Sequence, residues 1–319
     1  MTIERPFLML LGLTALVALA GCEHGGARTA FDGTTALGYV KTQLDFGTRV
    51  PGTEGARKTG DWIVEQMKQR ADTVIEQRWT HVTVKGDTLP LRNILARFRP
   101  DDPDRVLYVT HWDTRPVSDG ENTPPGEQNL PMPGANDGGS GVALFIALGD
   151  VLKKTPPTVG VDLLFVDGED YGSFNAPPCP HGQDCPAYGP DVLIGSAYFA
   201  KHLPSPDYHP LYGVLWDMIG DANLDIYQEP NSMNGAPEVV TLVWGEANKL
   251  GYSRYFIPQP DPKGAVIDDH IPLLQAGLRV IDVLDIDYPY HHTPQDTLDK
   301  LSAQSLQVVG DVATALVTQ

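Results

Sequence analysis

Short apolar runs alternate with amphipathic segments along most of this chain. Leu144, Leu148 and Leu152 recur four residues apart, with Phe145 and Val151 beside them, and this spacing predicts a helix over 140–153. Further helices are predicted at 35–44, 53–70, 194–203, 237–250, 269–276 and 297–317. Apolar runs rich in β-branched residues predict strands at 74–84, 91–98, 106–110, 159–166, 211–218 and 280–284.

Strands that alternate with helices are typical of a mostly parallel sheet covered by helices on both faces. The chain has 319 residues, enough for one large α/β domain with a sizeable core. We therefore expect a single domain over 35–319, with a central mixed, mostly parallel twisted sheet. In open sheets of this class the ligand lies outside the carboxyl ends of the strands.

The first 34 residues have a different pattern. Arg5 supplies a short basic start, 7–20 are largely apolar, and Leu19-Ala-Gly-Cys22 closes the run. An apolar stretch of about 14 residues is too short for a stable transmembrane helix and fits an export signal. Leu-Ala-Gly-Cys resembles the bacterial lipobox, which implies a signal peptide over 1–21, a lipid on Cys22 and a tether over 22–34. An ordinary signal peptide with an incidental cysteine is the alternative.

The composition of the chain limits the kinds of partner that the protein can bind. The net charge of −18 excludes binding of nucleic acid or anionic lipid by charge, so we expect membrane contact through a lipid anchor only. We expect an exported protein, anchored in the bacterial periplasm or outer membrane. Cys179 and Cys185 lie six residues apart, and in an exported protein this spacing predicts a disulfide. A metal site formed by the two cysteines and His181 is the alternative.

Histidines and carboxylates gather at the ends of the predicted elements. Five segments carry them: 110–114, 134–138, 166–170, 267–270 and 291–293. Asp217 lies inside the apolar run 214–219, where a carboxylate has to be paired, hydrogen-bonded or directed at a metal. Histidine beside carboxylates is a ligand set of catalytic zinc. The pattern favours a metal site with a spare carboxylate for proton transfer, as in a hydrolase or an acyl transferase.

In order and spacing these segments resemble the metal motifs of the zinc aminopeptidase superfamily and, within it, the metal-dependent glutaminyl cyclases. The resemblance covers roughly 37–317. It implies zinc ligation by Asp137, Asp170 and His292, and a general acid/base role for Glu169. It also implies that Asp113 orients His111 or the loop.

The resemblance leaves two activities open. In the aminopeptidases a second zinc adds the equivalents of His111 and Asp217, with Asp137 bridging the two metals. Asp268 separates the groups, because the aminopeptidases usually have a small residue there and the cyclases a second aspartate. A proton-sharing network of Glu169, Asp217 and Asp268 withdraws Asp217 from a second metal, which favours one zinc.

The expected reaction is therefore conversion of the N-terminal glutamine of peptides or proteins to pyroglutamate, with release of ammonia. A two-zinc aminopeptidase is the first alternative. A non-catalytic binding lipoprotein is the second, and the complete set of ligands together with Glu169 argues against it.

The chain departs from the family pattern at three positions. Asp170 replaces the second glutamate of a Glu-Glu pair, His291 replaces a tryptophan of the animal cyclases, and Asp282 replaces a histidine. The last two concern the substrate pocket. Nearby candidates to line that pocket are Trp112, Trp216, Tyr288, Tyr290 and His291. The alternative for the two tryptophans is a place in the core, which is more common for a tryptophan at a strand end. For His270 we expect a structural role.

Overall fold

In a computed structural model of the protein, the described residues are 28–174 and 189–319, together with Met1. The predictions for Cys22, Cys179 and Cys185 lie outside these ranges. None of the helices within the described ranges combines the length and the hydropathy that crossing a bilayer requires.

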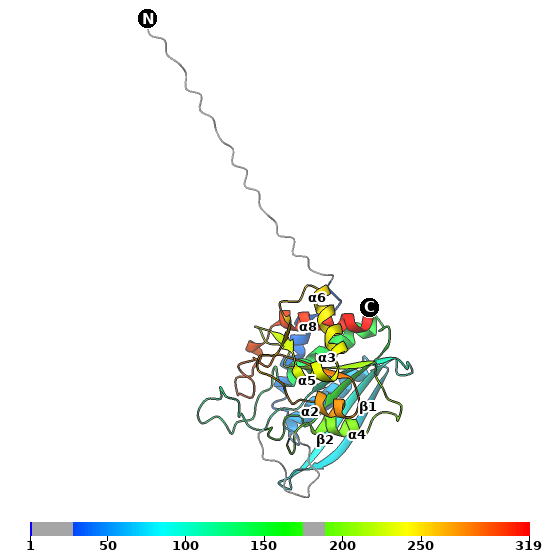
Figure 1. The fold of residues 1–319 in the computed structure, drawn as a ribbon. Coiled ribbons are helices and arrows are strands. Elements are labelled where there is room, and N and C mark those ends of the chain that lie inside the picture. Colours follow the sequence, from blue (N-terminus) through cyan, green and yellow to red (C-terminus); the bar gives the residue numbers. More distant parts are fainter. Residues whose placement is uncertain (2–27, 175–188) are drawn as a thin grey trace.

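Six strands form the main sheet, in the order β1-β2-β4-β3-β5-β8. They are β1 Thr73–Val82, β2 Thr88–Phe98, β3 Arg105–His111, β4 Gly160–Val166, β5 Tyr212–Asp217 and β8 Val280–Leu284. The first two strands, β1 and β2, are labelled in Figure 1. The four strands β4, β3, β5 and β8 run parallel to one another, while β1 and β2 add an antiparallel hairpin at the β4 edge. The predicted mixed, mostly parallel sheet is confirmed.

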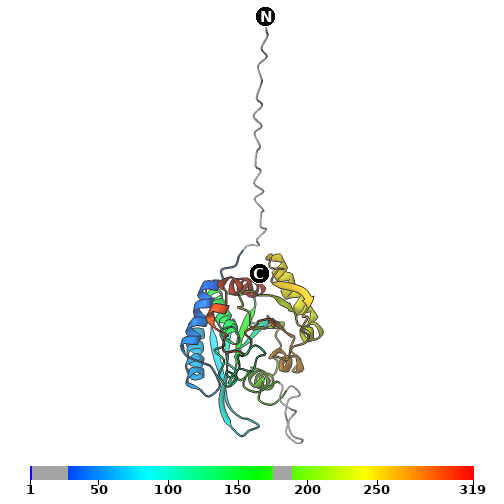
Figure 2. The same cartoon turned by 90° about the vertical axis from the view of Figure 1, so that its left-hand side faces the viewer.

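Helices cover both faces of this sheet. Strand residues point alternately to the two faces, so Val106 and Tyr108 of β3 pack into one cluster and Leu107 and Val109 into another. The larger cluster lies under α1 Gly33–Asp45, α2 Glu54–Lys68, α3 Gly139–Lys154, α6 Pro237–Lys249 and α8 Ala303–Thr318. The smaller cluster contains residues of α4 Ile194–Lys201 and α7 His270–Gln275. Figure 2 shows α1 and α2 (blue) on one side of the molecule and α6 (yellow) on the other.

Four short elements were not predicted: β6 Ile226–Gln228, α5 Pro230–Gly235, β7 Phe256–Pro260 and the 3₁₀ turn Leu298–Lys300. They are too short for a hydrophobic period to develop, and β6 pairs with β7 in a separate two-stranded sheet. The last predicted helix, over 297–317, also began too early. It starts at Ala303, because the side chain of Ser302 accepts hydrogen bonds from the backbone N–H groups of Gln304 and Ser305 and caps it.

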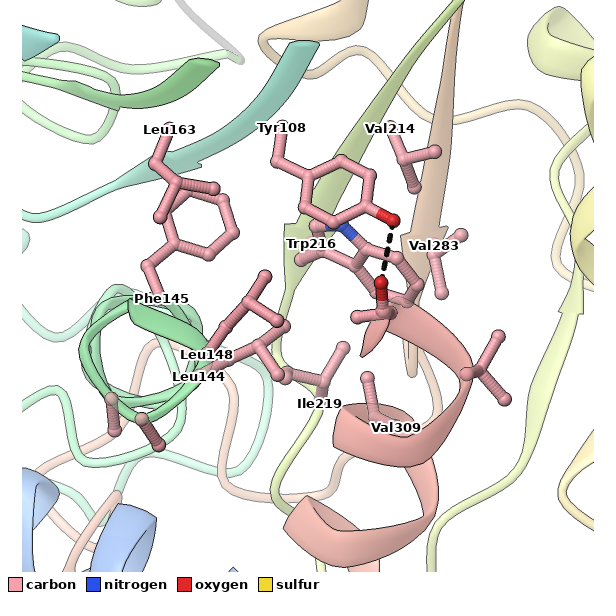
Figure 3. Packing of buried hydrophobic residues seen from close by; sticks show 14 of the residues in the cluster. Tyr108, Leu144, Phe145, Leu148, Leu163, Val214, Trp216, Ile219, Val283 and Val309 are labelled. Atoms are coloured by element: carbon pink, nitrogen blue, oxygen red, sulfur yellow. Dashed lines mark hydrogen bonds between the residues drawn. The ribbon is translucent and has the colours of Figure 1, made fainter. Parts of the chain in front are cut away.

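Tyr108 joins the sheet to the closing helix. Its hydroxyl donates a hydrogen bond of 2.8 Å to the carbonyl of Ala313 in α8 (Figure 3). Its ring packs edge-on against Trp216 of β5, with centroids 5.5 Å apart. Both side chains are fully buried. This contact fixes the position of α8 against the strands that carry His111 and Asp217.

We expect Tyr108→Phe to lower the free energy of unfolding by about 1 kcal/mol, because the buried hydrogen bond is lost while the ring still fills its place. Urea unfolding checks this. Tyr227→Phe, at a partly exposed ring, serves as the control and should leave the midpoint unchanged. An unchanged midpoint in Tyr108→Phe would show that the hydroxyl makes no net contribution to the free energy of unfolding.

Candidate active site

The carboxyl ends of the parallel strands bring the predicted residues to one edge of the sheet. β3 ends at His111, β5 ends at Asp217, and Glu169 and Asp170 follow the end of β4. A cavity of about 330 Å³ opens at this edge. Its lining consists of Arg115, Asp119, Asp137, Glu169, Phe174, Asp217, Met218, Val266, Ile267, Asp268, Leu284, Ile286, His291 and His292.

Asp137 and His292 line this cavity, and His292 lies beside both Asp137 and Asp170. The Nε2 atom of His292 lies 3.1 Å from Oδ1 of Asp170 and 3.6 Å from Oδ2 of Asp137. Two donors bound tetrahedrally to one zinc, with bonds near 2.05 Å, are roughly 3.3 Å apart. Within the described part of the chain, Oδ2 of Asp137 and Oδ2 of Asp170 are buried and lack a hydrogen-bond partner. Because burial of unpaired carboxylates is costly, these oxygens fit a bound cation, and the three residues suit zinc.

A second set of donors forms around His111. Its Nε2 atom is 3.1 Å from Oδ1 of Asp137 and 3.1 Å from Oδ1 of Asp217. Asp137 therefore faces both sets, one with each carboxylate oxygen. His111, Asp137 and Asp217 form one group that could hold a metal ion, and Asp137 with His291 and His292 forms another.

The electrostatics of these groups reflect their crowding. Burial and the neighbouring charge of Asp170 raise the pKa of Asp137 to about 7. Burial also opposes ionisation of Asp170, but His292 and Arg115 outweigh it and hold the pKa of Asp170 well below its usual value. A dication would offset the repulsion between the two carboxylates.

Buried residues far along the chain hold the Asp137 turn in place. The carboxylate of Asp296 accepts hydrogen bonds from the backbone N–H groups of Asn136, at 2.9 Å, and Asp137, at 3.1 Å. The fully buried guanidinium of Arg49 donates to the carbonyls of Gly134 and Asp137, at 2.6 and 3.2 Å. Sequence reasoning did not assign these roles, because neither residue belongs to a metal motif.

Asp113 positions the loop that carries Glu169. Its two carboxylate oxygens accept hydrogen bonds of 3.1 Å from the backbone N–H groups of Glu169 and Asp170. The distance of 3.5 Å between its Oδ1 and Nδ1 of His111 is too long for a good hydrogen bond. Of the two alternatives predicted for Asp113, the structure therefore favours the contact with the loop. Gly168 permits the turn before Glu169, with φ of +73°.

The backbone at His292 adopts a left-handed conformation, with φ of +55°. Consecutive side chains in an extended chain point to opposite sides, whereas here the rings of His291 and His292 lie together, with centroids 3.8 Å apart. Such a conformation costs about 1–3 kcal/mol and is found mainly where function requires it.

Arg115 and Asp119 support the His292 side of the site. The guanidinium of Arg115 donates twice to Asp119, at 2.6 and 2.7 Å, and once to Oδ1 of Asp170, at 3.1 Å. Oδ1 of Asp119 lies 3.5 Å from Nδ1 of His292. Sequence reasoning missed both residues. The sequence feature that could have indicated Arg115 is its position two residues after Asp113.

Glu169, Asp217 and Asp268 line the same cavity, as the predicted proton-sharing network requires. Burial, followed by the charge of Asp170, raises the pKa of Glu169 well above its usual value. Burial, followed by the charge of Asp217, raises the pKa of Asp268 to about 6. Carboxyl groups with such pKa values can exchange protons near neutral pH.

The predictions for the pocket wall need correction. Trp112 and Trp216 are both buried in the larger core cluster. For Trp216, alternation along β5 directs the side chain away from the face used by Asp217. Tyr288 and Tyr290 pack against each other, with ring centroids 5.5 Å apart, and are not among the lining residues. Only His291 of the five predicted residues lines the cavity. Its apolar wall is made by Phe174, Met218, Val266, Ile267, Leu284 and Ile286.

His270 lies away from the candidate metal ligands, consistent with the structural role expected for it. Its buried ring lies between two carboxylates, with Nε2 3.3 Å from Glu229 and Nδ1 3.6 Å from Asp282. Asp282, the third departure from the family pattern, is therefore a buried neighbour of His270.

We expect chelation of bound metal to lower the melting temperature by roughly 10 °C, because a ligand at about a thousand times its Kd contributes about 4 kcal/mol. Differential scanning calorimetry with and without chelator measures the change, and added zinc should reverse it. The melting temperature of His292→Ala should not respond to the chelator. A chelator effect of equal size in that variant would place the metal elsewhere.

The sheet order, the strand-end ligands and the cavity together define an α/β metalloenzyme of the zinc exopeptidase type. Residues 93–317 match peptidase family M28, and the chain belongs to this family.

Solved structures similar to this chain include a zinc-dependent exopeptidase from Parabacteroides distasonis, at 31% identity and a TM-score of 0.83, covering 92% of this chain and 100% of the other. The glutaminyl cyclase of Porphyromonas gingivalis is 32% identical with a TM-score of 0.81, and the match covers 91% of this chain and 98% of the other. Aminopeptidase YwaD of Bacillus subtilis is 23% identical over 282 residues, 82% of this chain; the chain spans about half of that relative, 51%. Because both activities occur among the similar proteins, the fold alone does not choose between them.

Proposed function

We propose that the protein is a zinc-dependent glutaminyl-peptide cyclotransferase, which converts N-terminal glutamine of peptides or proteins to pyroglutamate and releases ammonia. The observation that carries this proposal is Asp268, a buried carboxyl that lines the same cavity as Glu169 and Asp217. Hydrolysis by a two-metal site has no need of this third carboxyl, whereas a reaction that moves one proton from amine to leaving group does.

The residues that would hold the zinc are Asp137, Asp170 and His292. When bound there, zinc supplies Lewis acidity that polarises the γ-carbonyl of the glutamine. Arg115, Asp119 and Asp113 keep these ligands and their loop in position through the contacts described above.

Glu169 performs the proton transfer in this proposal. Its carboxylate takes a proton from the α-amino group, whose nitrogen forms a bond to the side-chain carbonyl carbon, Cδ, of the same residue. Glu169 then delivers that proton to the amide nitrogen, whose bond to Cδ breaks, and ammonia leaves. Asp268 shares protons with Glu169 and Asp217 during the transfer. Since the nucleophile is tethered to the substrate, orientation provides much of the rate.

The cavity suits a glutamine residue in size and character. Its volume of about 330 Å³ accommodates the side chain and the free amine. The apolar wall, which includes Met218, Leu284 and Ile286, can pack against the methylene groups, while the carboxyl groups face the reacting end. These aliphatic side chains supply the apolar contact that the tryptophan of the animal cyclases would otherwise provide at position 291.

An aminopeptidase is the second candidate, and one observation favours it. Nε2 of His111 lies 3.1 Å from a carboxylate oxygen of Asp137 and 3.1 Å from one of Asp217, close to the spacing of donors on one zinc. Against this, Asp217 already accepts a hydrogen bond from the backbone N–H of Met218 and neighbours Asp268.

We also propose that the mature protein is exported and held at the membrane by a lipid on Cys22, with a disulfide between Cys179 and Cys185. These proposals rest on the sequence. Substrates would then be peptides or protein N-termini that reach the same compartment.

The experiment that tests the function measures three quantities on purified protein: zinc per chain, ammonia released from peptides that begin with Gln, and amino acid released from peptides that begin with Leu. One zinc with ammonia release supports the cyclotransferase. Two zincs with amino-acid release would establish the aminopeptidase, and Asp268 would then have another role.

A further inference from the structure

His291 offers a donor that the zinc set proposed above does not use. One ligand atom each of Asp137, His291 and His292 lies within 4.8 Å of the other two. The left-handed backbone at His292 places both imidazoles on the cavity side, where they line the wall together. If the side chain of His291 served only to fill space, it would not need to be a second imidazole beside the buried carboxylate of Asp137.

The distances support a shared metal. Nε2 of His291 lies 3.9 Å from Oδ2 of Asp137, compared with 3.6 Å for Nε2 of His292. Donors of one tetrahedral zinc are roughly 3.3 Å apart, so the distance from His291 to Asp137 exceeds this spacing by about half an ångström. Its side chain is 33% exposed, which leaves the ring room to turn. Oδ2 of Asp137, which both rings face, is the oxygen without a hydrogen-bond partner in the described ranges.

We propose that His291 is an auxiliary ligand of the metal held by Asp137, Asp170 and His292. A catalytic zinc site keeps one position open, and His291 would occupy that position until a substrate carbonyl displaces it. Imidazole nitrogen can do this, whereas the indole that it replaces has a donor N–H and no lone pair to offer. This inference rests on the proposed zinc site but not on the reaction catalysed there.

Metal binding by the full-length protein tests the inference without any activity measurement. Apo-protein competes with a chromophoric chelator for zinc, and the visible spectrum of the cobalt(II)-loaded protein reports the coordination. We expect His291→Phe to weaken zinc binding at least tenfold and to lower the intensity of the cobalt bands. His209→Phe is the matched control, because His209 is exposed and lies beside Arg279 at the amino end of β8, and it should match the wild type.

A second variant guards against a folding defect in His291→Phe. Cobalt-loaded His291→Ala should bind added imidazole and regain the wild-type spectrum, whereas the wild type should not respond at the same imidazole concentration.

Wild-type zinc affinity in His291→Phe, together with no response of His291→Ala to imidazole, would overturn the inference. His292→Ala separates the two proposals. If His292→Ala loses zinc while His291→Phe keeps it, the proposed active site stands and the auxiliary ligand is wrong. If His292→Ala binds zinc as the wild type does, both are wrong.

Discussion

Glu169→Gln is expected to lower kcat for the cyclisation of Gln-peptides by about 10²–10⁴-fold, while the zinc content stays at the wild-type value. The amide has the shape of the carboxylate but cannot accept the proton of the α-amine. Glu169 is not one of the proposed ligands, and its backbone N–H remains bonded to Asp113, so the loop should keep its conformation.

Ammonia release under steady-state conditions measures this effect, with zinc determined on the same samples. Glu121→Gln, at an exposed carboxylate, provides the control and should retain wild-type kcat. If Glu169→Gln kept more than a tenth of the activity, Glu169 could not be the group that moves the proton. If the variant lost its zinc as well, its low activity would report on the metal and not on proton transfer.

The second large effect is expected from Asp268→Asn, which should reduce kcat for cyclisation by about 10²-fold. Burial and the charge of Asp217 raise the pKa of the Asp268 carboxyl to about 6, so it can give and take a proton near neutral pH. Asparagine keeps the volume and a carbonyl that can accept the hydrogen bond now made by the backbone N–H of Asp269, but it carries no exchangeable acid proton. The network of Glu169 and Asp217 then loses its third member.

Kinetics with Gln-peptides and Leu-peptides should be compared for the wild type, Asp268→Asn and the exposed-site control Asp207→Asn. We expect loss of ammonia release in Asp268→Asn alone and unchanged zinc content in all three proteins. Wild-type cyclisation by Asp268→Asn would remove the argument that separates the cyclotransferase from the aminopeptidase. The assignment would then depend on the metal count.

The proposed auxiliary ligand His291 affects how the zinc content of Glu169→Gln and Asp268→Asn should be measured. A ligand that leaves when substrate binds changes the apparent zinc affinity, so zinc content should be compared in the absence of peptide. The same precaution applies to the chelator experiment, in which peptide could protect the metal.

The pattern of the sequence was sufficient for the fold class. Alternating apolar runs and amphipathic segments report which side chains face a core, and this local information predicted all six main-sheet strands within a few residues of their ends. Because parallel strands end at a common edge, the strand-end positions of His111 and Asp217 indicated that they would meet. The order β1-β2-β4-β3-β5-β8 and the small β6-β7 sheet could not be obtained this way, since pairing depends on contacts between distant segments.

By itself, then, the sequence determined the class of fold, the residues that gather at the carboxyl edge and the type of metal they suit. Tertiary structure alone decided how those residues are held. Asp296 supports Asp137 from a position 159 residues away, and Arg115 bonds to Asp170 across 55 residues. It also decided that Trp216 faces the core and that His291 lies beside His292. The physical reason is that periodicity records burial, whereas the pairing of buried charges and the left-handed turn at His292 are imposed by segments remote in the chain.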